Sequence, residues 1–167
     1  MKKQTIFVGA GALVIGVLLT AVIGFYSMPS MMMLEDESPH DFATTVEVFE
    51  REVSAGGWSV LQTHDMQAIL AGHGHDVAAV KIYELCSSKY SAEILRLDDE
   101  RIVSPLMPCR VAIYEKSNGS TYIARMNSEL MARPFGGVIA AVMNQAAVET
   151  EVVIERVLDP GVAIGSR

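Results

Sequence analysis

A long uncharged stretch near the N-terminus constrains this chain more than any other feature. No Asp, Glu, Lys, Arg or His occurs from Gln4 to Leu34, and within that stretch Ile6–Phe25 is an unbroken run of apolar and small residues. A helix of that run would be about 30 Å long, which matches the hydrocarbon core of a bilayer. The sequence therefore predicts one transmembrane helix ahead of the domain that follows.

The charges on either side of this run predict its orientation. Lys2 and Lys3 precede it, and the acidic segment 35–37 follows it. By the positive-inside rule the N-terminus is cytoplasmic and the remainder lies in the periplasm or outside the cell. A cleaved signal peptide is the alternative, but it needs a shorter apolar core and a small-x-small cleavage site. The length of the run favours an anchor that is retained in the cytoplasmic membrane.

Small residues recur every fourth position within the predicted span, at Ala12, Gly16, Thr20 and Gly24. This spacing places them on one face of a helix. Transmembrane helices associate where small residues let their backbones approach closely. The stripe predicts a helical partner, either a second copy of this chain or a subunit of a larger membrane complex. The alternative is that glycine and alanine are simply common in spans.

The charge balance of the remaining chain excludes some classes of partner. The sequence has 13 basic and 20 acidic residues, a formal charge of -7. Without Lys2 and Lys3 the count is 11 against 20, or -9. A nucleic-acid binder needs a basic face to neutralise phosphates, so we expect no nucleic-acid partner. The high apolar content also excludes disorder over most of the length.

Periodicity in the body predicts one α+β domain, with an anchor at 1–28, an extracytoplasmic domain at 29–158 and a tail at 159–167. Ser38 is interpreted as the N-cap of a first helix with Pro39 in its first turn. The expected strands and helices alternate, and an Asn-Gly turn at 117–120 predicts a hairpin. Strands are expected at 58–63, 77–86, 109–115 and 121–125, and helices at 66–71, 87–95 and from 128 toward 154. This order favours an antiparallel sheet covered by helices.

The two cysteines are the sharpest chemical feature of the body. Cys86 ends one expected strand and Cys109 begins another, so we expect them at the same end of the sheet. In an oxidising compartment they could form a disulfide. They could also be a redox thiol pair, soft metal ligands, or two unpaired thiols. The Cys-x-x-Cys spacing of disulfide oxidoreductases is absent, which favours a non-catalytic domain.

Three histidines are candidate ligand-binding residues. His73 and His75 are separated by one residue in a Gly-rich loop, and His64 ends an expected strand. Imidazole suits transition metals and haem iron, so a haem or metal cofactor is a hypothesis, with His73, His75, Cys86 and Cys109 as the candidate metal ligands. The alternative is an exposed loop that binds nothing.

Several segments together resemble a known family. They are Gly57–Leu61, Thr63–Asp65, Glu84–Cys86, Met107–Lys116 and Gly136–Ile139. The stretch from Gly57 to Glu155 resembles domain-of-unknown-function family 302. The resemblance implies a TATA-binding-protein-like α+β topology and a homo-oligomer. Family members without an export segment carry the same cysteine pair, which a purely structural disulfide would not explain. The sequence departs from the family at 87–88, where Ser-Ser replaces the usual Asn-Pro.

Three functions are consistent with these observations. The first is a membrane-anchored, extracytoplasmic, non-catalytic domain that binds a small ligand, haem or metal. The second is an accessory single-span subunit of a respiratory or photosynthetic membrane complex. The third is a thiol redox protein that uses Cys86 and Cys109.

Overall fold

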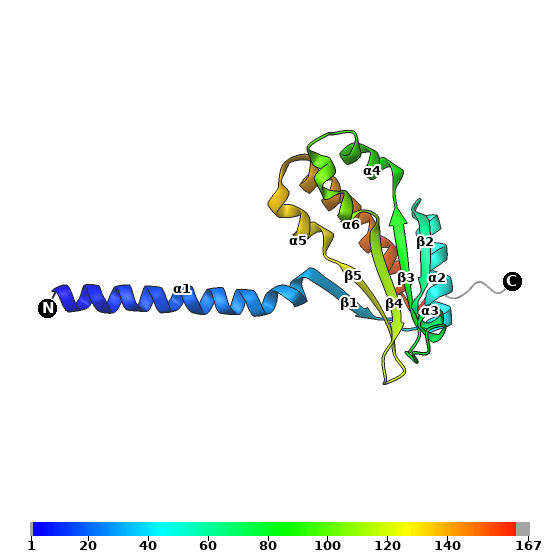
Figure 1. The fold of residues 1–167 in the computed structure, drawn as a ribbon, viewed down its shortest axis with the longest axis horizontal. Helices are drawn as coiled ribbons and strands as arrows, with labels where there is room; N and C mark the ends of the chain where they lie inside the picture. The colour runs from blue at the N-terminus through cyan, green and yellow to red at the C-terminus, as the bar shows by residue number, and fades with distance from the viewer. Residues whose placement is uncertain (1, 163–167) are drawn as a thin grey trace. The chain divides into compact units, whose positions relative to one another are not determined.

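The computed structural model describes residues 2–162 and separates into two compact units at Met32. The first unit is the single helix α1 (Lys2–Met32), which includes Pro29 near its end (Figure 1). The predicted boundary after residue 28 therefore falls inside α1. By length and composition, Leu13–Met32 could cross a membrane. The C-terminal helix α6 (Gly137–Val157) meets the same criteria although it packs in the core, so this test alone is weak evidence.

The second unit is built on a five-stranded antiparallel sheet (Figure 1). Its order is β1-β5-β4-β3-β2. The strands are β1 (Met33–Glu37), β2 (Ser59–Asp65), β3 (Val80–Cys86), β4 (Cys109–Glu115) and β5 (Thr121–Met126). The predicted α+β class and antiparallel sheet are therefore confirmed. The TATA-binding-protein-like topology stays a prediction.

The central hairpin fixes the register of the sheet. Gly119 has φ +82°, which glycine adopts without strain, and Asn118 Oδ1 accepts a hydrogen bond from the Ser120 amide at 3.0 Å. This turn aligns Ile113 opposite Ile123, with Val111 opposite Arg125 two residues further along. Alternate side chains of a strand face opposite sides of a sheet, so all four of these residues point to the same face.

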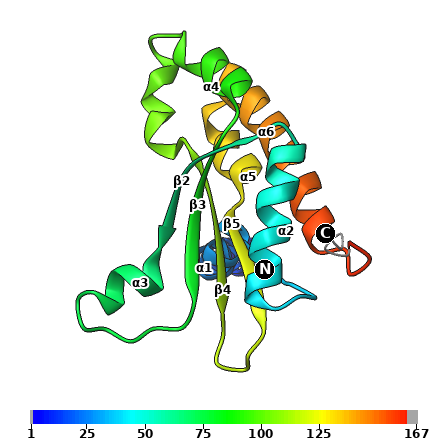
Figure 2. The same ribbon diagram turned by 90° about the vertical axis from the view of Figure 1, so that its right-hand side faces the viewer.

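The helices α2 (Phe42–Ala55) and α6 cover that face of the sheet (Figure 2). Tyr83, Leu85, Val111, Ile113 and Ile123 from the sheet are almost fully buried. They form one core with the apolar stripe of α2 and with the inward side of α6. Three shorter helices complete the fold, α3 (Met66–Ala71), α4 (Ser88–Leu95) and α5 (Ser128–Ala132), together with the 3-10 turns η1 (Glu100–Leu106) and η2 (Arg133–Phe135).

The start of α2 differs from the prediction. Asp41, not Ser38, is the N-cap, because its side chain accepts a hydrogen bond from the Thr44 amide at 2.8 Å. The Ser38 amide instead donates to the Thr121 carbonyl at 2.8 Å, and its hydroxyl lies 2.8 Å from the Thr45 hydroxyl. Ser38 thus continues the backbone pairing of β1 with β5 and does not cap α2.

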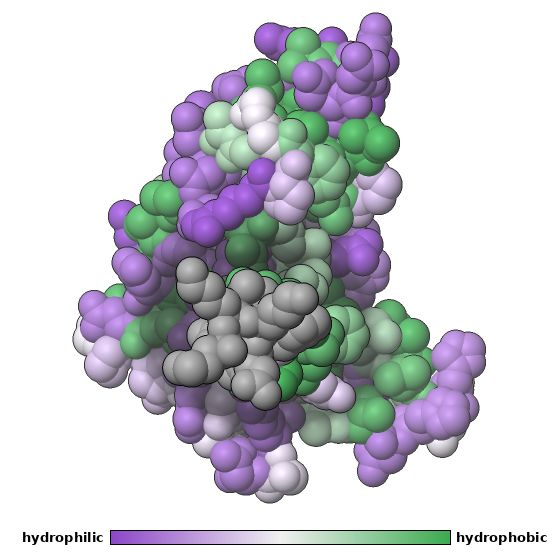
Figure 3. Space-filling model, turned by 90° about the vertical axis from the view of Figure 1, so that its left-hand side faces the viewer, coloured by the Kyte–Doolittle hydropathy of each residue, from purple (hydrophilic) through white to green (hydrophobic). Residues whose placement is uncertain are grey.

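The other face of the sheet carries aromatic and charged side chains. Tyr114 and Tyr122 stack with ring centroids 6.1 Å apart, and the Lys116 ammonium lies 3.7 Å from the Tyr122 ring centroid. Lys116 also pairs with Glu35 of β1 at 2.7 Å. In the space-filling view of one side of the molecule, hydrophilic and hydrophobic residues are interspersed (Figure 3). Such mixing is typical of a domain surface that faces water.

Candidate functional site

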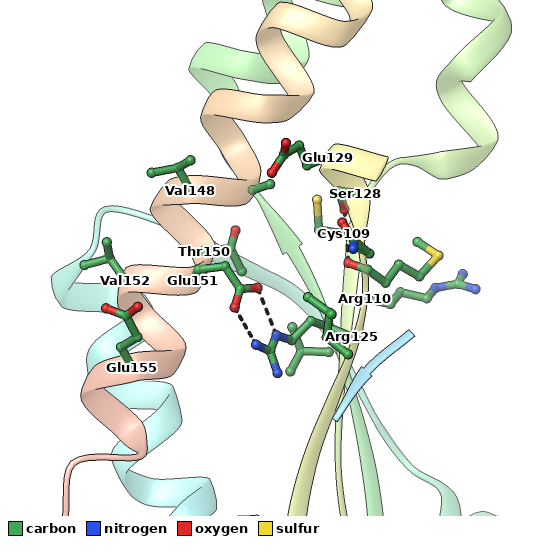
Figure 4. Close-up of a pocket in the computed structure, with 15 residues that line it drawn as sticks. Cys109, Arg110, Arg125, Ser128, Glu129, Val148, Thr150, Glu151, Val152 and Glu155 are labelled. Atoms are coloured by element: carbon green, nitrogen blue, oxygen red, sulfur yellow. Dashed lines mark hydrogen bonds and ion pairs between the residues drawn. The ribbon is translucent and has the colours of Figure 1, made fainter. Parts of the chain in front are cut away.

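A cavity lies between α6 and the end of the sheet where β5 stops and β4 starts (Figure 4). Its volume is about 320 Å³. The local sequence forms this recess because Asn127 ends β5 and caps α5, accepting a hydrogen bond from the Leu130 amide at 3.1 Å. The chain thereby turns away from the sheet and leaves the strand ends facing the side of α6. We call this recess the lateral cavity. Its lining residues are Leu34, Cys109, Arg110, Val111, Arg125, Met126, Asn127, Ser128, Glu129, Ala147, Val148, Thr150, Glu151, Val152 and Glu155.

A buried arginine forms part of the lateral cavity. The Arg125 side chain is only 9% exposed and projects from the core face of β5 toward α6. Its Nε donates to Glu151 Oε1 at 2.9 Å, and its Nη2 pairs with Glu151 Oε2 (Figure 4). Its Nη1 pairs with Asp36 of β1. Burial acts to lower the pKa of Arg125, but the hydrogen bonds to Glu151 and Asp36 outweigh it and raise the pKa above its ordinary value. The guanidinium therefore stays charged and ties β1, β5 and α6 together.

The other charges around the lateral cavity leave an acidic surplus. Glu129 pairs with Arg133 at 2.6 Å, and Arg110 pairs with Glu84 at 3.0 Å. Among the described residues, Glu155 makes no ion pair, and Arg125 already has two carboxylate partners. The cavity is therefore suited to a neutral or positively charged group better than to an anion.

A second, smaller cavity lies on the other side of Cys109. Its volume is about 40 Å³, and it is lined by the apolar side chains of Trp58, Leu85, Ile94 and Val142 among others. Two thiols and two thioethers line it, from Cys86, Cys109, Met107 and Met143. We call this cavity the sulfur slot. Cys109 and Ser128 line both cavities.

The register determines where the two cysteines lie along the sheet. Leu85 is paired with Cys109 across β3 and β4, so both cysteines lie at the same end of the sheet, as predicted. Both are free thiols in the structure. The Cys86 sulfur lies 3.2 Å from the Ser91 hydroxyl. Burial raises the pKa of the Cys109 thiol, and the neighbouring Cys86 raises it further.

The structure does not bring the histidine pair to the cysteines. His73 and His75 lie in the loop between α3 and β3, at the start of β3, whereas Cys86 is its last residue. A seven-residue strand separates the two ends by about 20 Å. Nowhere in residues 2–162 do three His, Cys, Asp or Glu side chains gather as a metal site. A ligand role for either histidine stays a prediction, but the histidines and cysteines do not share a site.

His64 lines neither cavity and lies in a polar network on the sheet. Its Nε2 is 3.3 Å from Glu84 Oε1, the same oxygen that pairs with Arg110. The hydrogen bond from His64, followed by that from Arg110, holds the pKa of Glu84 below its ordinary value, although partial burial opposes this. His64 is therefore part of an ion-pair network that spans β2, β3 and β4.

Sequence reasoning missed the Arg125–Glu151 pair. The available signal was the position of Arg125 within a strand whose inward residues Thr121 and Ile123 are buried. A charge at an inward position of an alternating strand indicates a partner from the covering helix. Its identity could not be predicted, because Glu151 lies far along the chain in α6.

Comparison with known proteins places the body in a family. A crystal structure described as an uncharacterized conserved protein DUF302 from Bacillus stearothermophilus superimposes with a TM-score of 0.68 at 19% sequence identity. The match covers 75% of this chain and 98% of that chain, and at this identity it shows the fold alone. No curated protein matches the chain. The model of the family DUF302, domain of unknown function, matches residues 34–159, a longer stretch than the resemblance from Gly57 to Glu155. The chain therefore belongs to the DUF302 family.

Proposed function

We propose that this protein is a single-pass membrane protein whose α+β body binds a small organic ligand in the lateral cavity, outside the cytoplasmic membrane. The observation that carries this proposal is the cavity itself, about 320 Å³ beside a fixed guanidinium–carboxylate pair. That volume is at the lower end of the range for ligand pockets, about 300–1,000 Å³. It suits a molecule smaller than a macrocycle. No histidine lines the cavity among the described residues, so the proposal does not include haem.

The walls define the chemistry of the ligand. Leu34, Val111, Val148 and Val152 are apolar, whereas the Arg125–Glu151 pair and Glu155 are polar. An apolar body therefore gains from burial, at about 25 cal/mol per Å², and one polar end can meet the carboxylates. A neutral or cationic amphiphile fits these walls.

The test is native mass spectrometry of the full chain, extracted in mild detergent from the membranes of its own cells. Ala147 lines the lateral cavity, and Ala147→Leu would fill part of it. Ala141 is exposed on the same helix and lines neither cavity, so Ala141→Leu is the matched control. Wild type and Ala141→Leu should carry one small-molecule adduct that Ala147→Leu has lost. Adduct-free wild type, or equal occupancy in both variants, contradicts the proposal.

The membrane anchor rests on α1 and its flanking charges. Lys2 and Lys3 precede the apolar run, and the side chains of Leu13–Phe25 are exposed in the structure. Alkaline phosphatase needs disulfides and is active only in an oxidising compartment. A fusion after residue 162 should therefore be active, and the protein should resist carbonate extraction. An inactive fusion, or recovery of the chain in the cytosol, removes this part of the proposal.

Association through α1 is the second candidate function, as a subunit of a larger membrane assembly. Nothing lies within 4 Å of an added Cβ at Gly16 or Gly24, and the Thr20 hydroxyl donates to the Gly16 carbonyl at 2.9 Å. This face is therefore flat and its hydroxyl is satisfied within the helix, which favours close packing. The side chain of Ala12 lies outside the described residues.

Sizing in gentle detergent tests this second candidate. Gly16→Leu should shift the protein from an assembly toward a monomer. Ala21→Leu adds bulk on a different face of α1 and should leave the size unchanged. A wild-type monomer, or equal sizes for the two variants, contradicts packing through the stripe.

A thiol redox function gains no support from the site. Reactive cysteines have a lowered pKa and partial exposure. The pKa of Cys109 is instead raised by burial and by Cys86.

A further inference from the structure

We infer that the sulfur slot is a binding site for a soft monovalent metal ion, Cu(I). Two cysteines and two methionines are among the residues that line one small cavity: Cys86, Cys109, Met107 and Met143. They come from the end of β3, the start of β4 and the middle of α6. This site is distinct from the lateral cavity, for which we propose an organic ligand.

The size of the slot selects an ion over an organic molecule. A volume of about 40 Å³ exceeds what one water occupies but is far below that of an organic ligand pocket. Trp58, Leu85, Ile94 and Val142 give the slot largely apolar walls. An ion in such a place must take its ligands from the protein.

The donor set selects the metal. No His, Asp or Glu is among the described residues that line the slot, so it lacks the carboxylates that magnesium and calcium sites commonly use and the imidazoles of mixed zinc sites. Thiolate and thioether sulfur are the soft ligands that Cu(I) prefers. Two thiols each lose a proton to water as the two copper–sulfur bonds form, and neither copper nor sulfur changes oxidation state. A thioether can supply a further, weaker bond.

The arrangement of the cysteines supports this assignment over a structural role. Both thiols are free, and both cysteines line the same cavity at one end of the sheet. Cys109 lines both cavities. A bound soft cation would explain why two cysteine thiols line one largely apolar slot.

Anaerobic titration of the full chain in detergent tests the inference. The protein is first reduced with a phosphine, and Cu(I) is supplied from its complex with bicinchoninate as the competing chelator. Wild type should withdraw one Cu(I) per chain. Because changes even in the outer shell of a metal site cost about 10- to 100-fold in affinity, Cys86→Ser and Cys109→Ser should each weaken binding by more than about 100-fold.

Matched variants test whether Cu(I) binds to the residues of the sulfur slot or to other methionines and histidines. Met107→Leu and Met143→Leu should weaken binding by about tenfold or more, whereas Met131→Leu, which lines neither cavity, should not change it. The double variant His73→Ala/His75→Ala should bind as wild type does. Ala147→Leu should also take up Cu(I) normally, which separates this inference from the ligand of the lateral cavity.

Three results would overturn the inference. The first is Cu(I) affinity that is unchanged when both cysteines are replaced by serine. The second is a reduced wild type that cannot compete with bicinchoninate. The third also comes from wild type and does not depend on any variant folding. X-ray absorption at the copper edge should show only sulfur neighbours, and nitrogen or oxygen donors in the first shell would exclude the slot.

Discussion

At the scale of single residues, Arg125 is the side chain on which the site and the fold both depend. It is buried, it bonds to Glu151 of α6 and Asp36 of β1, and it lines the lateral cavity. Removing one partner of a buried ion pair is costly, because the remaining charge keeps its desolvation penalty. Here two carboxylates would be left facing each other.

We predict that Arg125→Met lowers the free energy of unfolding by about 2–3 kcal/mol. The value is below that for fully buried pairs because Asp36 and Glu151 are 44% and 35% exposed. Denaturant unfolding followed by fluorescence measures it, since Trp58 is buried and is the single tryptophan of the chain. Arg133→Met breaks an exposed pair with Glu129 and should cost less than about 1 kcal/mol. Equal losses would show that burial of Arg125 does not matter.

The Cys109 thiol gives a second prediction at this scale. Burial, with a further effect from Cys86, raises its pKa above the ordinary value of 9.0. In Cys86→Ala the alkylation rate of Cys109 by iodoacetamide should therefore rise with a midpoint above pH 9.0, because burial remains. Mass spectrometry of the modified peptide measures this rate. A midpoint below 9.0 would indicate an activated thiol and would revive the redox function.

At the scale of elements, the cap of α2 shows how one hydrogen bond sets a helix start. The Asp41 carboxylate accepts from the Thr44 amide, and this hydrogen bond is the main reason why the pKa of Asp41 is below its ordinary value of 3.8. A carboxylate with a lowered folded-state pKa stabilises the fold above its unfolded pKa. That contribution is lost as the pH falls through the folded-state value.

We predict that Asp41→Ala lowers the unfolding temperature at pH 7, because the Thr44 amide loses its acceptor. Asp41→Asn should retain most of the stability at pH 7, since asparagine caps almost as well. It should also flatten the loss of stability between about pH 5 and pH 2, because the amide does not titrate. Thermal unfolding followed by circular dichroism across this range checks both results. An unchanged pH profile in Asp41→Asn would show that another carboxylate dominates.

Several elements could be predicted from sequence because their signals are local. The bounds of β4 and α3 agree with the predicted ranges, since alternation and a terminal Gly72 mark them. The start of α2 could not be predicted, because Ser38 is held by its long-range hydrogen bond to Thr121. The two cavities were also unpredictable, because they depend on how α6 packs on the sheet. Of the candidate site, only the proximity of Cys86 and Cys109 followed from strand order.

At the scale of the whole molecule, β1 decides where the body begins. It pairs with β5 along its full length, and its Asp36 forms an ion pair with Arg125. The body is a separate compact unit from Met33 onward, and the family match begins at residue 34. The acidic segment after the predicted span is therefore part of the sheet.

We predict that a chain starting at Met33 folds without α1, whereas one starting at Ser38 does not. The shorter chain loses β1, exposes the backbone of β5 and leaves Arg125 without Asp36. Far-ultraviolet circular dichroism and cooperative unfolding of the two chains check this. A cooperative fold from Ser38 onward would show that β1 is dispensable.

The two outer strands also govern how copies of this molecule meet. The edge strand β1 carries Glu35, Asp36 and Glu37 in succession, and the other edge, β2, has an irregularity in its pairing between Val60 and Gln62. Consecutive like charges and bulges both discourage strand-to-strand addition between chains. Fibril growth should therefore be suppressed at neutral pH. Loss of these negative charges should weaken that protection first on this edge.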